Sequence, residues 1–146
     1  MLEYKEIKLE NLSEITEIYM ETFNAEPWND NWTIETASKR LHQIITTEDF
    51  YGICAYNNGE ICGLILGNME QFYDGIMFNI KEFVVRNNMR GHGLGSKIFK
   101  EFETRLKNLG ISEIILLTIR GKYTEHFYHN QGVKTCNDLI FMKKQL

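Results

Sequence analysis

The stretch V-V-R-N-N-M-R-G-H-G-L-G, residues 84–95, decides the fold of this chain and points to its chemistry. It starts at the end of an apolar, β-branched run, passes through a short polar turn and contains three glycines, Gly91, Gly93 and Gly95, before a helical pattern begins. A glycine-rich turn at a helix N-terminus presents free backbone N–H groups, and the helix dipole favours an anion there. Arg90 adds a charge suited to phosphate oxygens. The sequence therefore predicts that this turn binds a phosphorylated ligand.

Two common phosphate-binding patterns do not fit this turn. A dinucleotide fingerprint needs G-x-G-x-x-G, but Ser96 occupies the place of the last glycine. The acidic residue expected at the end of the next strand is also missing, since Glu113 lies at its start. No Gly-Lys-Ser/Thr follows, which excludes the Walker pattern. The alternative without a ligand is that the glycines only form a tight strand-to-helix turn.

The spacing of apolar residues predicts alternating strands and helices. We expect strands at residues 4–9, 50–56, 61–69, 76–85 and 114–119, with further strand candidates at 133–135 and 139–143. We expect helices at residues 11–23, 33–45, 94–109 and 124–131, the first of them begun by a capping box between Asn11 and Glu14. The 114–119 segment is nearly all apolar, as in a strand buried on both faces. This order predicts one α/β domain, residues 1–146, with a mixed sheet flanked by helices.

Composition narrows the function classes. The chain has 146 residues and a formal charge of −4, which argues against a nucleic-acid binder with a basic face. Its three cysteines, Cys54, Cys62 and Cys136, form no C-x-x-C pair, so we expect buried free thiols. No signal-peptide pattern and no membrane-spanning apolar run is visible. We therefore expect a cytoplasmic protein with no membrane partner.

The motif R-G-H-G-L-G, at residues 90–95, resembles the Gln/Arg-x-x-Gly-x-Gly/Ala signature of the GNAT superfamily of acetyl-CoA-dependent N-acetyltransferases. Residues 127–133, F-Y-H-N-Q-G-V, resemble the second signature of that family, in which a Phe-Tyr pair on a short helix precedes Gly-Phe. The order of elements is similar too, so the resemblance covers nearly the whole chain. It implies the GNAT fold, a central, mostly antiparallel sheet flanked by about four helices.

The resemblance implies acetyl-CoA as the cosubstrate and assigns residues to it. Val84 and Val85 would lie along the pantetheine arm, and a backbone N–H there would polarise the thioester carbonyl as an oxyanion hole does. Backbone groups of the glycine turn would hold the pyrophosphate of coenzyme A; the residues are Arg90, Gly91, His92, Gly93, Leu94, Gly95 and Ser96.

The resemblance also implies that Tyr128 is the general acid. A phenol with a pKa near 10 can protonate the thiolate that leaves when an amine attacks the thioester. The alternative is a half-buried aromatic residue with a hydrated hydroxyl group.

Glu82 is the candidate base or anchor for the substrate amine. If no bulge intervenes, Glu82 shares one face of its strand with apolar neighbours, namely Ile76, Phe78, Ile80 and Val84. Burying a carboxylate in such a row destabilises the fold unless the group has a hydrogen-bonding partner, so a catalytic role could explain its presence. Partial burial raises its pKa. The alternatives are a salt bridge to Arg86 or Arg120, or a bulge that turns the carboxylate to solvent.

An aromatic stretch near the first helix is the candidate acceptor wall. Phe23, Trp28 and Trp32 fall where the first two helices of GNAT proteins cover the acceptor, and nearby acidic residues, Glu26, Asp30 and Glu35, would attract a cation. The alternative is that both tryptophans fill the core between the two helices.

Two positions depart from the family pattern. Gly121 replaces an Asn that contacts the cofactor, and Val133 replaces the Phe after Gly132. The three histidines at positions 92, 126 and 129 lack acidic or cysteine partners at supporting spacings, so we expect no metal site.

Together these features predict an N-acetyltransferase that moves an acetyl group from acetyl-CoA to a primary amine of a small molecule or peptide. The transfer would be direct, in a ternary complex. The alternative is a catalytically silent acyl-CoA sensor or binding subunit of the same fold. A homodimer is possible.

Overall fold

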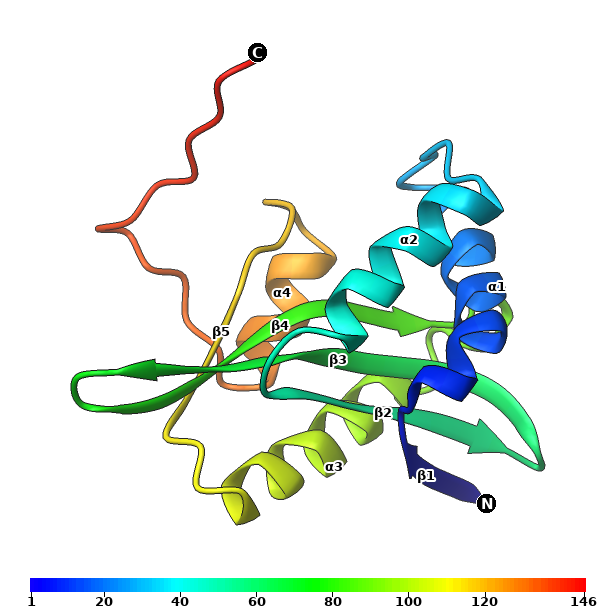
Figure 1. Ribbon diagram of the computed structural model, residues 1–146, viewed down its shortest axis with the longest axis horizontal. Coiled ribbons are helices and arrows are strands. Elements are labelled where there is room, and N and C mark those ends of the chain that lie inside the picture. Colours follow the sequence, from blue (N-terminus) through cyan, green and yellow to red (C-terminus); the bar gives the residue numbers. More distant parts are fainter.

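The computed structural model describes residues 1–146 and is built on one five-stranded sheet with the strand order β1-β2-β3-β4-β5 (Figure 1). The first four strands are antiparallel to their neighbours: β1 (Leu2–Glu6), β2 (Phe50–Asn57), β3 (Glu60–Phe72) and β4 (Gly75–Val85). The last strand, β5 (Glu113–Leu116), pairs in parallel with β4. The predicted mixed, mostly antiparallel sheet is therefore confirmed.

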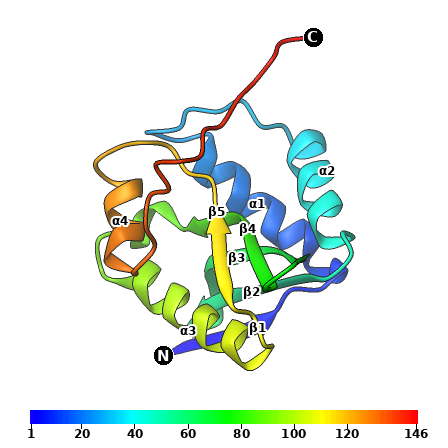
Figure 2. The same cartoon turned by 90° about the vertical axis from the view of Figure 1, so that its left-hand side faces the viewer.

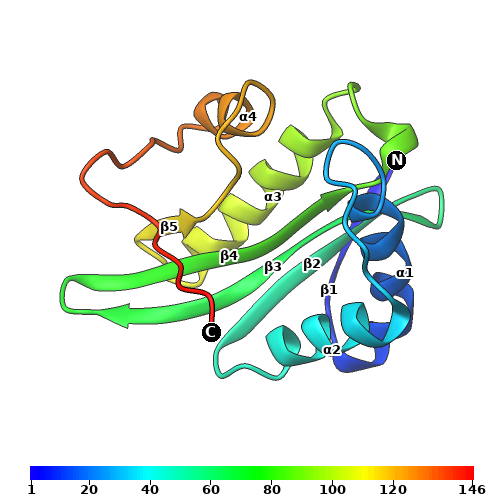
Figure 3. The same ribbon diagram turned by 90° about the horizontal axis from the view of Figure 1, so that it is seen from above.

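Helices cover both faces of this sheet (Figure 3). On one face lie α1 (Leu12–Phe23), which follows a 3₁₀ turn η1 (Leu9–Asn11), and α2 (Ile34–Ile45). On the other lie α3 (Leu94–Asn108), preceded by a second turn η2 (Asn87–Met89), and α4 (Thr124–Asn130). Each face buries its own apolar cluster, one against α1 and α2 and the other against α3. The predicted alternation of elements is confirmed up to α4.

A β-bulge in β4 changes which face of the sheet its side chains occupy. Leu66 lies opposite Glu82 but Gly67 lies opposite Ile80, which leaves Lys81 as an extra residue without a partner. Because side chains alternate along a strand, one extra residue reverses the faces beyond it. Ile80 packs into the α3-side cluster, whereas Glu82 contacts side chains of α1 and α2. The expectation that Ile76, Phe78, Ile80, Glu82 and Val84 share one face is therefore wrong.

Gly67 is required at this bulge. A Cβ on Gly67 would lie 1.9 Å from the carbonyl oxygen of Asn79 and 2.9 Å from its carbonyl carbon, so no other residue fits without moving β4. The close approach of the two backbones keeps the bulge in one place along β4.

The strands β4 and β5 part soon after they meet. They pair only from Met77 opposite Glu113 to Ile80 opposite Leu116. Beyond Ile80, β4 continues through Phe83 to Val85 without a strand on that side (Figure 2). The parting begins beside the bulge, and it leaves the last five residues of β4 open to α4.

The N-terminal boundaries differ from expectation. The first strand ends at Glu6 rather than at residue 9, and Leu9 starts the turn η1. The predicted capping box between Asn11 and Glu14 does not form, because the Asn11 side chain accepts a hydrogen bond from the Lys8 N–H at 2.8 Å. Thr33, which was expected as the first helical residue, is instead the N-cap of α2 and accepts from the Thr36 N–H at 3.1 Å.

The C-terminal strands are the largest departure. Residues 133–135 and 139–143 form no strand, and β5 stops at Leu116, so Leu117 and Ile119 are exposed. The expectation of a strand buried on both faces is wrong too, because β5 is the edge of the sheet and its apolar residues are only half-buried. An apolar sequence predicts a strand, but it does not say whether both edges of that strand are paired.

Candidate functional site

The glycine turn forms a cradle at the N-terminus of α3. Gly91 and Gly93 have φ values of +83° and +74°, a left-handed conformation that favours glycine. A Cβ at either position would meet no atom within 4 Å, so packing does not explain these glycines. Gly93 is the N-cap of α3 and provides no capping side chain. The N–H groups of the first turn are therefore free to bind an anion.

Gly95, unlike Gly91 and Gly93, is required for side-chain packing. A Cβ on Gly95 would lie 3.2 Å from the ring of Phe127, which means that its absence lets α4 pack against the start of α3. The Gln131 side chain donates a 2.8 Å hydrogen bond to the Ser96 hydroxyl and ties the two helices again. The two sequence motifs, distant along the chain, therefore form one structural unit.

Tyr128 lies in α4 beside the open part of β4. Its ring packs edge-on against Phe127, Phe99 and Phe83, at centroid distances of 5.2, 6.2 and 6.5 Å. Burial, assisted by the negative charge of Glu82, raises the pKa of Tyr128 to about 12. The phenol is therefore protonated at neutral pH, as a proton donor must be.

Glu82 is held beneath α1 and α2. Its Oε1 accepts hydrogen bonds from the Tyr19 hydroxyl at 3.2 Å and from Nη2 of Arg40 at 3.4 Å. Only 13% of its side chain is exposed, and this burial raises the pKa of Glu82 although Arg40 opposes the shift. Neither Arg86 nor Arg120 is its ion-pair partner, since Arg86 pairs with Glu21 at 3.4 Å. The bulge turns Glu82 toward Tyr19 and not toward solvent.

Tyr19 and Arg40 are the site residues that the sequence did not identify. Tyr19 had a signal, because it lies four residues before Phe23 on one face of α1, but that spacing indicates core packing rather than a polar contact. Burial and the Glu82 charge raise the pKa of the Tyr19 hydroxyl, so it stays protonated as a donor. Arg40 had no signal, because its contact with Glu82 depends on how α2 crosses β4.

The candidate acceptor wall is a row of touching aromatic rings. Tyr19 contacts Phe23 and Trp32, with ring centroids 4.9 and 5.1 Å apart, and Phe23 contacts Trp28 at 5.0 Å. The Asn24 side chain fixes the loop by bonding both the N–H and the carbonyl of Trp32, at 2.8 and 2.9 Å. Trp32 packs on the core cluster beneath α1 and α2, whereas Trp28 does not belong to it. Core packing, the alternative to an acceptor wall, is therefore found for Trp32 and not for Trp28.

Arg90 joins the glycine turn to this aromatic row. Its guanidinium lies 4.7 Å from the centroid of the Trp28 ring, a cation–π geometry, and its Nε donates to the Val85 carbonyl at 3.4 Å. Its Nη2 is buried without a hydrogen-bond partner, and burial lowers the pKa of Arg90. An unsatisfied buried donor costs about 1–3 kcal/mol, which favours a ligand that accepts from it.

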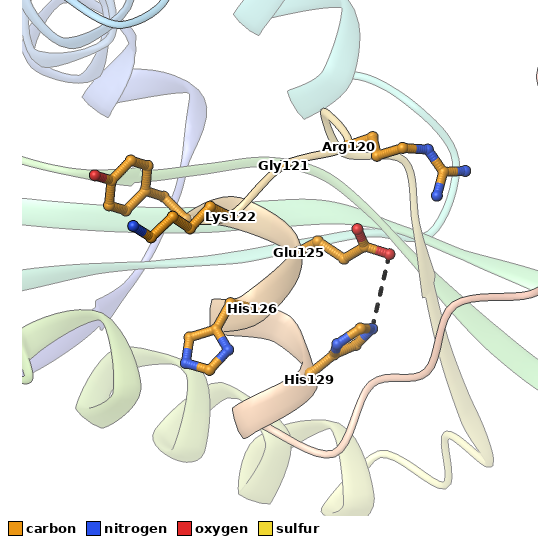
Figure 4. A pocket seen from close by; sticks show the side chains of 7 residues that line it. Arg120, Gly121, Lys122, Glu125, His126 and His129 are labelled. Atoms are coloured by element: carbon orange, nitrogen blue, oxygen red, sulfur yellow. Dashed lines mark ion pairs between the residues drawn. The ribbon is translucent and has the colours of Figure 1, made fainter.

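Two hollows lie outside the catalytic candidates. The larger, about 630 Å³, is on the outer side of α4 and is lined by Arg120, Gly121, Lys122, Tyr123, Glu125, His126 and His129 (Figure 4). A second, about 450 Å³, lies at the glycine turn, where His92, Leu94 and Lys97 line it. His92 is therefore in a different place from His126 and His129, and no group of three or more His, Cys, Asp or Glu side chains could hold a metal ion.

The structure also bears on the predictions for the three cysteines, for Val133 and for membrane-spanning segments. Cys54 and Cys62 are buried free thiols, but Cys136 is exposed, because the segment after α4 leaves the domain. Val133, in place of the usual Phe, still packs into the α3-side cluster. None of the helices has both the length and the apolar character that crossing a membrane requires.

Solved structures share this fold across their whole length. A possible acetyltransferase from Clostridium difficile 630 matches with a TM-score of 0.83 and 12% identity, over 100% of this chain and 99% of that one. An aminoglycoside acetyltransferase from an uncultured soil metagenomic sample, solved with sisomicin, matches at 0.78 and 17%, over 99% and 96%. Glucosamine-6-phosphate N-acetyltransferase from Arabidopsis thaliana matches at 0.70 and 18%, over 99% and 98%.

Comparison at the level of sequence gives one clear result. No curated protein matches the chain. The family model for the acetyltransferase (GNAT) family, however, matches residues 12–133, which include both the glycine turn and Tyr128. The fold, the two joined motifs and this match agree, and the chain belongs to the GNAT acetyltransferase family.

Proposed function

We propose that this chain is an N-acetyltransferase that moves an acetyl group from acetyl-CoA to a primary amine by direct attack in a ternary complex. The observation that carries the proposal is the position of Tyr128. Its protonated phenol lies against Phe83, in the part of β4 that β5 leaves unpaired, and α4 is joined to the glycine turn through Phe127 and Gly95. This arrangement supports a phosphate cradle and a proton donor acting on one ligand.

The residues present fit coenzyme A. The free N–H groups between Gly91 and Ser96 suit a pyrophosphate, and the unpartnered Nη2 of Arg90 offers a further donor. Val84 is buried while Val85 is half-buried, and the Val85 carbonyl already accepts from Arg90 but retains a second lone pair for the pantetheine arm. Acetyl-CoA supplies the acetyl group as an activated thioester.

The two titratable residues would then move protons. Tyr128 gives its phenol proton to the departing sulfur, as the amine forms its bond to the acetyl carbon and the carbon–sulfur bond breaks. Glu82 accepts the proton of the substrate ammonium, directly or through water, or holds that ammonium in place. The raised pKa of Glu82, caused by burial, brings the carboxylate closer to the basicity needed for the first role.

The acceptor half of the chain favours a cationic amine. Between Leu9 and Ser38 there is no Lys, Arg or His, whereas seven acidic residues occur there: Glu10, Glu14, Glu17, Glu21, Glu26, Asp30 and Glu35. This segment forms α1 and the loop that contains Trp28 and Trp32. Arg86 pairs with Glu21 and Arg90 lies over Trp28, but the other acidic residues of the segment leave a net negative charge, which attracts a cation. The structural similarity to an acetyltransferase solved with sisomicin supports the same class of acceptor.

The test is thiol release from acetyl-CoA with a panel of aminoglycosides, polyamines, amino acids and peptides with free N-termini. We expect turnover with at least one polycationic amine and little with anionic amines. Binding of acetyl-CoA without thiol release for every amine would instead support an acyl-CoA sensor. Lack of any acetyl-CoA binding at millimolar concentration would refute both.

We further propose that the protein acts in the cytoplasm, without nucleic-acid or membrane partners, and that it is a homodimer.

A further inference from the structure

Arg40 occupies a position in α2 where the helical pattern predicts an apolar residue. It lies three residues after Ala37 and four before Ile44, and both of these are buried, so the three residues share one stripe of the helix. The Arg40 guanidinium makes one ion pair, with Glu82 of β4. A cation on the stripe that packs against the sheet loses part of its hydration, and this loss is costly without a specific partner. The partner of Arg40 is the candidate base of the site.

Two donors meet on the same oxygen atom of Glu82. Oε1 accepts from the Tyr19 hydroxyl at 3.2 Å and from Nη2 of Arg40 at 3.4 Å. A carboxylate oxygen has two lone pairs, so both acceptor positions of Oε1 are occupied. Oε2 has no hydrogen-bond partner in the protein, yet the polar atoms that are buried without a partner do not include it, so it is open to solvent. A proton that Glu82 accepts therefore goes to Oε2.

Charged and titratable groups from several elements act on this carboxylate. Burial raises the pKa of Glu82, whereas Arg40 of α2 and Tyr19 of α1 lower it. Asp30, in the loop before α2, raises that pKa through its negative charge. From α4, Tyr128 is close enough that the Glu82 charge adds to burial in raising the pKa of the phenol. Among these groups Arg40 is the one cation.

We infer that Arg40 is a positioning residue of acetyl transfer: together with Tyr19 it holds Oε1 of Glu82, so that Oε2 is the oxygen that meets the substrate amine. This role depends on the proposed function, and Arg40 itself acts through Glu82. A carboxylate held from two sides keeps its reactive oxygen in one place. The nearby guanidinium also favours the ionised form, which can accept a proton, at the cost of making Glu82 a weaker base.

The first experiment is the pH profile of kcat/KM for Arg40→Met, which removes the charge and keeps an unbranched side chain that can pack on the sheet. We expect the acidic limb to move to higher pH. At neutral pH kcat/KM should fall about tenfold, and at alkaline pH it should approach that of the unaltered protein. Arg40→Lys keeps the charge and should keep the limb near its original position. Lys39→Met is the matched control, because it removes the same charge from an exposed neighbouring position and should leave the profile unchanged.

A second experiment asks whether Arg40 acts through Glu82. In a Glu82→Gln protein, adding Arg40→Met should change kcat/KM less than about twofold, because the carboxylate on which Arg40 acts is gone. Tyr19→Phe keeps the ring contacts with Phe23 and Trp32 and removes only the hydroxyl donor. It should also move the acidic limb to higher pH, and it gives the same readout if Arg40→Met does not fold.

The ionisation of Glu82 is measurable without turnover. In protein whose glutamates carry carbon-13 at Cδ, the resonance that disappears in Glu82→Gln belongs to Glu82, and its titration should move to higher pH in Arg40→Met. Acetylation of an amine with an unmoved titration would overturn the role of Arg40 and leave the proposed function intact. A moved titration without acetylation of any amine would instead refute the proposed function, and a role in that reaction with it.

Three results of the kinetic experiments would also overturn the role of Arg40. One is a fall in kcat/KM by the same factor at every pH, which would show that the ion pair only stabilises the fold. A second is an effect of Arg40→Met that persists at full size in the Glu82→Gln protein. A third is an equal shift of the limb in Lys39→Met, which would assign the effect to net charge.

Discussion

The half of the molecule around the glycine turn and the half around α1 and α2 are built by different rules. The turn, the start of α3 and α4 bring together two short motifs whose glycines are required one by one, by positive φ at Gly91 and Gly93 and by contact with Phe127 at Gly95. The α1–α2 half has no motif. Its site is a set of contacts among Tyr19, Arg40 and the loop to Trp32.

The difference teaches where specificity can vary. A binding turn made of backbone groups tolerates few residue types, so it can be recognised in a single sequence. Such a turn suits a cosubstrate that is the same in all members of a family. Side chains that meet across helices can be substituted without loss of the fold. The residues of the α1–α2 half can therefore differ between proteins that use different acceptors. Arg90 on Trp28 is a direct contact between the two halves.

The largest effect on this comparison should come from Tyr128→Phe. We expect kcat to fall about 10²–10⁴-fold, because the proton donor is lost, while affinity for acetyl-CoA changes little. Steady-state kinetics and calorimetric titration measure the two quantities. Tyr123→Phe is the matched control, since Tyr123 is exposed and precedes the same helix, and it should retain activity. Full activity in the Tyr128 variant would remove the acid role.

Glu82→Gln should separate function from stability. We expect kcat/KM to fall about 10²-fold, with loss of the acidic limb of its pH profile, because a base is removed. The stability of the folded protein at neutral pH should instead increase. Burial raises the folded-state pKa of Glu82, so the stability that this group provides is present at low pH and lost as pH rises through the raised pKa.

The amide stays neutral, so the melting temperature of the Gln variant should exceed that of the unaltered protein at neutral pH. The two should converge as the pH falls below the pKa of the carboxyl. Thermal melts from acidic to neutral pH check this sign. A variant less stable at neutral pH would show that the Arg40 ion pair outweighs the desolvation of the carboxylate.

Gly93→Ala compared with Gly110→Ala isolates the cradle. Both glycines have positive φ, +74° and +81°, and neither Cβ would meet another atom within 4 Å. Both variants should lose about 1 kcal/mol of stability from backbone strain. Only Gly93→Ala, at the N-terminus of α3, should also weaken acetyl-CoA binding, by about tenfold. Equal binding in the two variants would mean that the turn is only structural.

The smallest expected effect is a change in tryptophan fluorescence. Trp28 becomes the only tryptophan in a Trp32→Phe protein, and its ring lies under the Arg90 guanidinium. If a pyrophosphate accepts from Arg90, the cation should shift and the emission of Trp28 should change on addition of coenzyme A. The change should disappear with Arg90→Met, although binding, followed by calorimetry, weakens only a few-fold.

The sequence predicts the local elements of the fold but not the contacts between distant elements. Periodicity and glycines predict α2, α3 and the strand-to-turn-to-helix unit at residues 84–95 because those signals are local. The face of Glu82 was not predictable, because the extra residue Lys81 leaves no mark in an apolar alternation. The ion pair to Arg40 and the contact of Arg90 with Trp28 depend on elements far apart in sequence, which no local pattern encodes.

The bulge at Lys81 has a consequence for insertions and deletions. Removing this one residue would leave Leu66 opposite Glu82 and Gly67 opposite Ile80 in an uninterrupted ladder, so Glu82 would still face α1 and α2 and only the local bend of the bulge would be lost. A substitution at Lys81, which is exposed, should by contrast be tolerated. The extra residue therefore sets the local bend of β4, where it parts from β5, while the face of Glu82 is set by its alternation with Ile80.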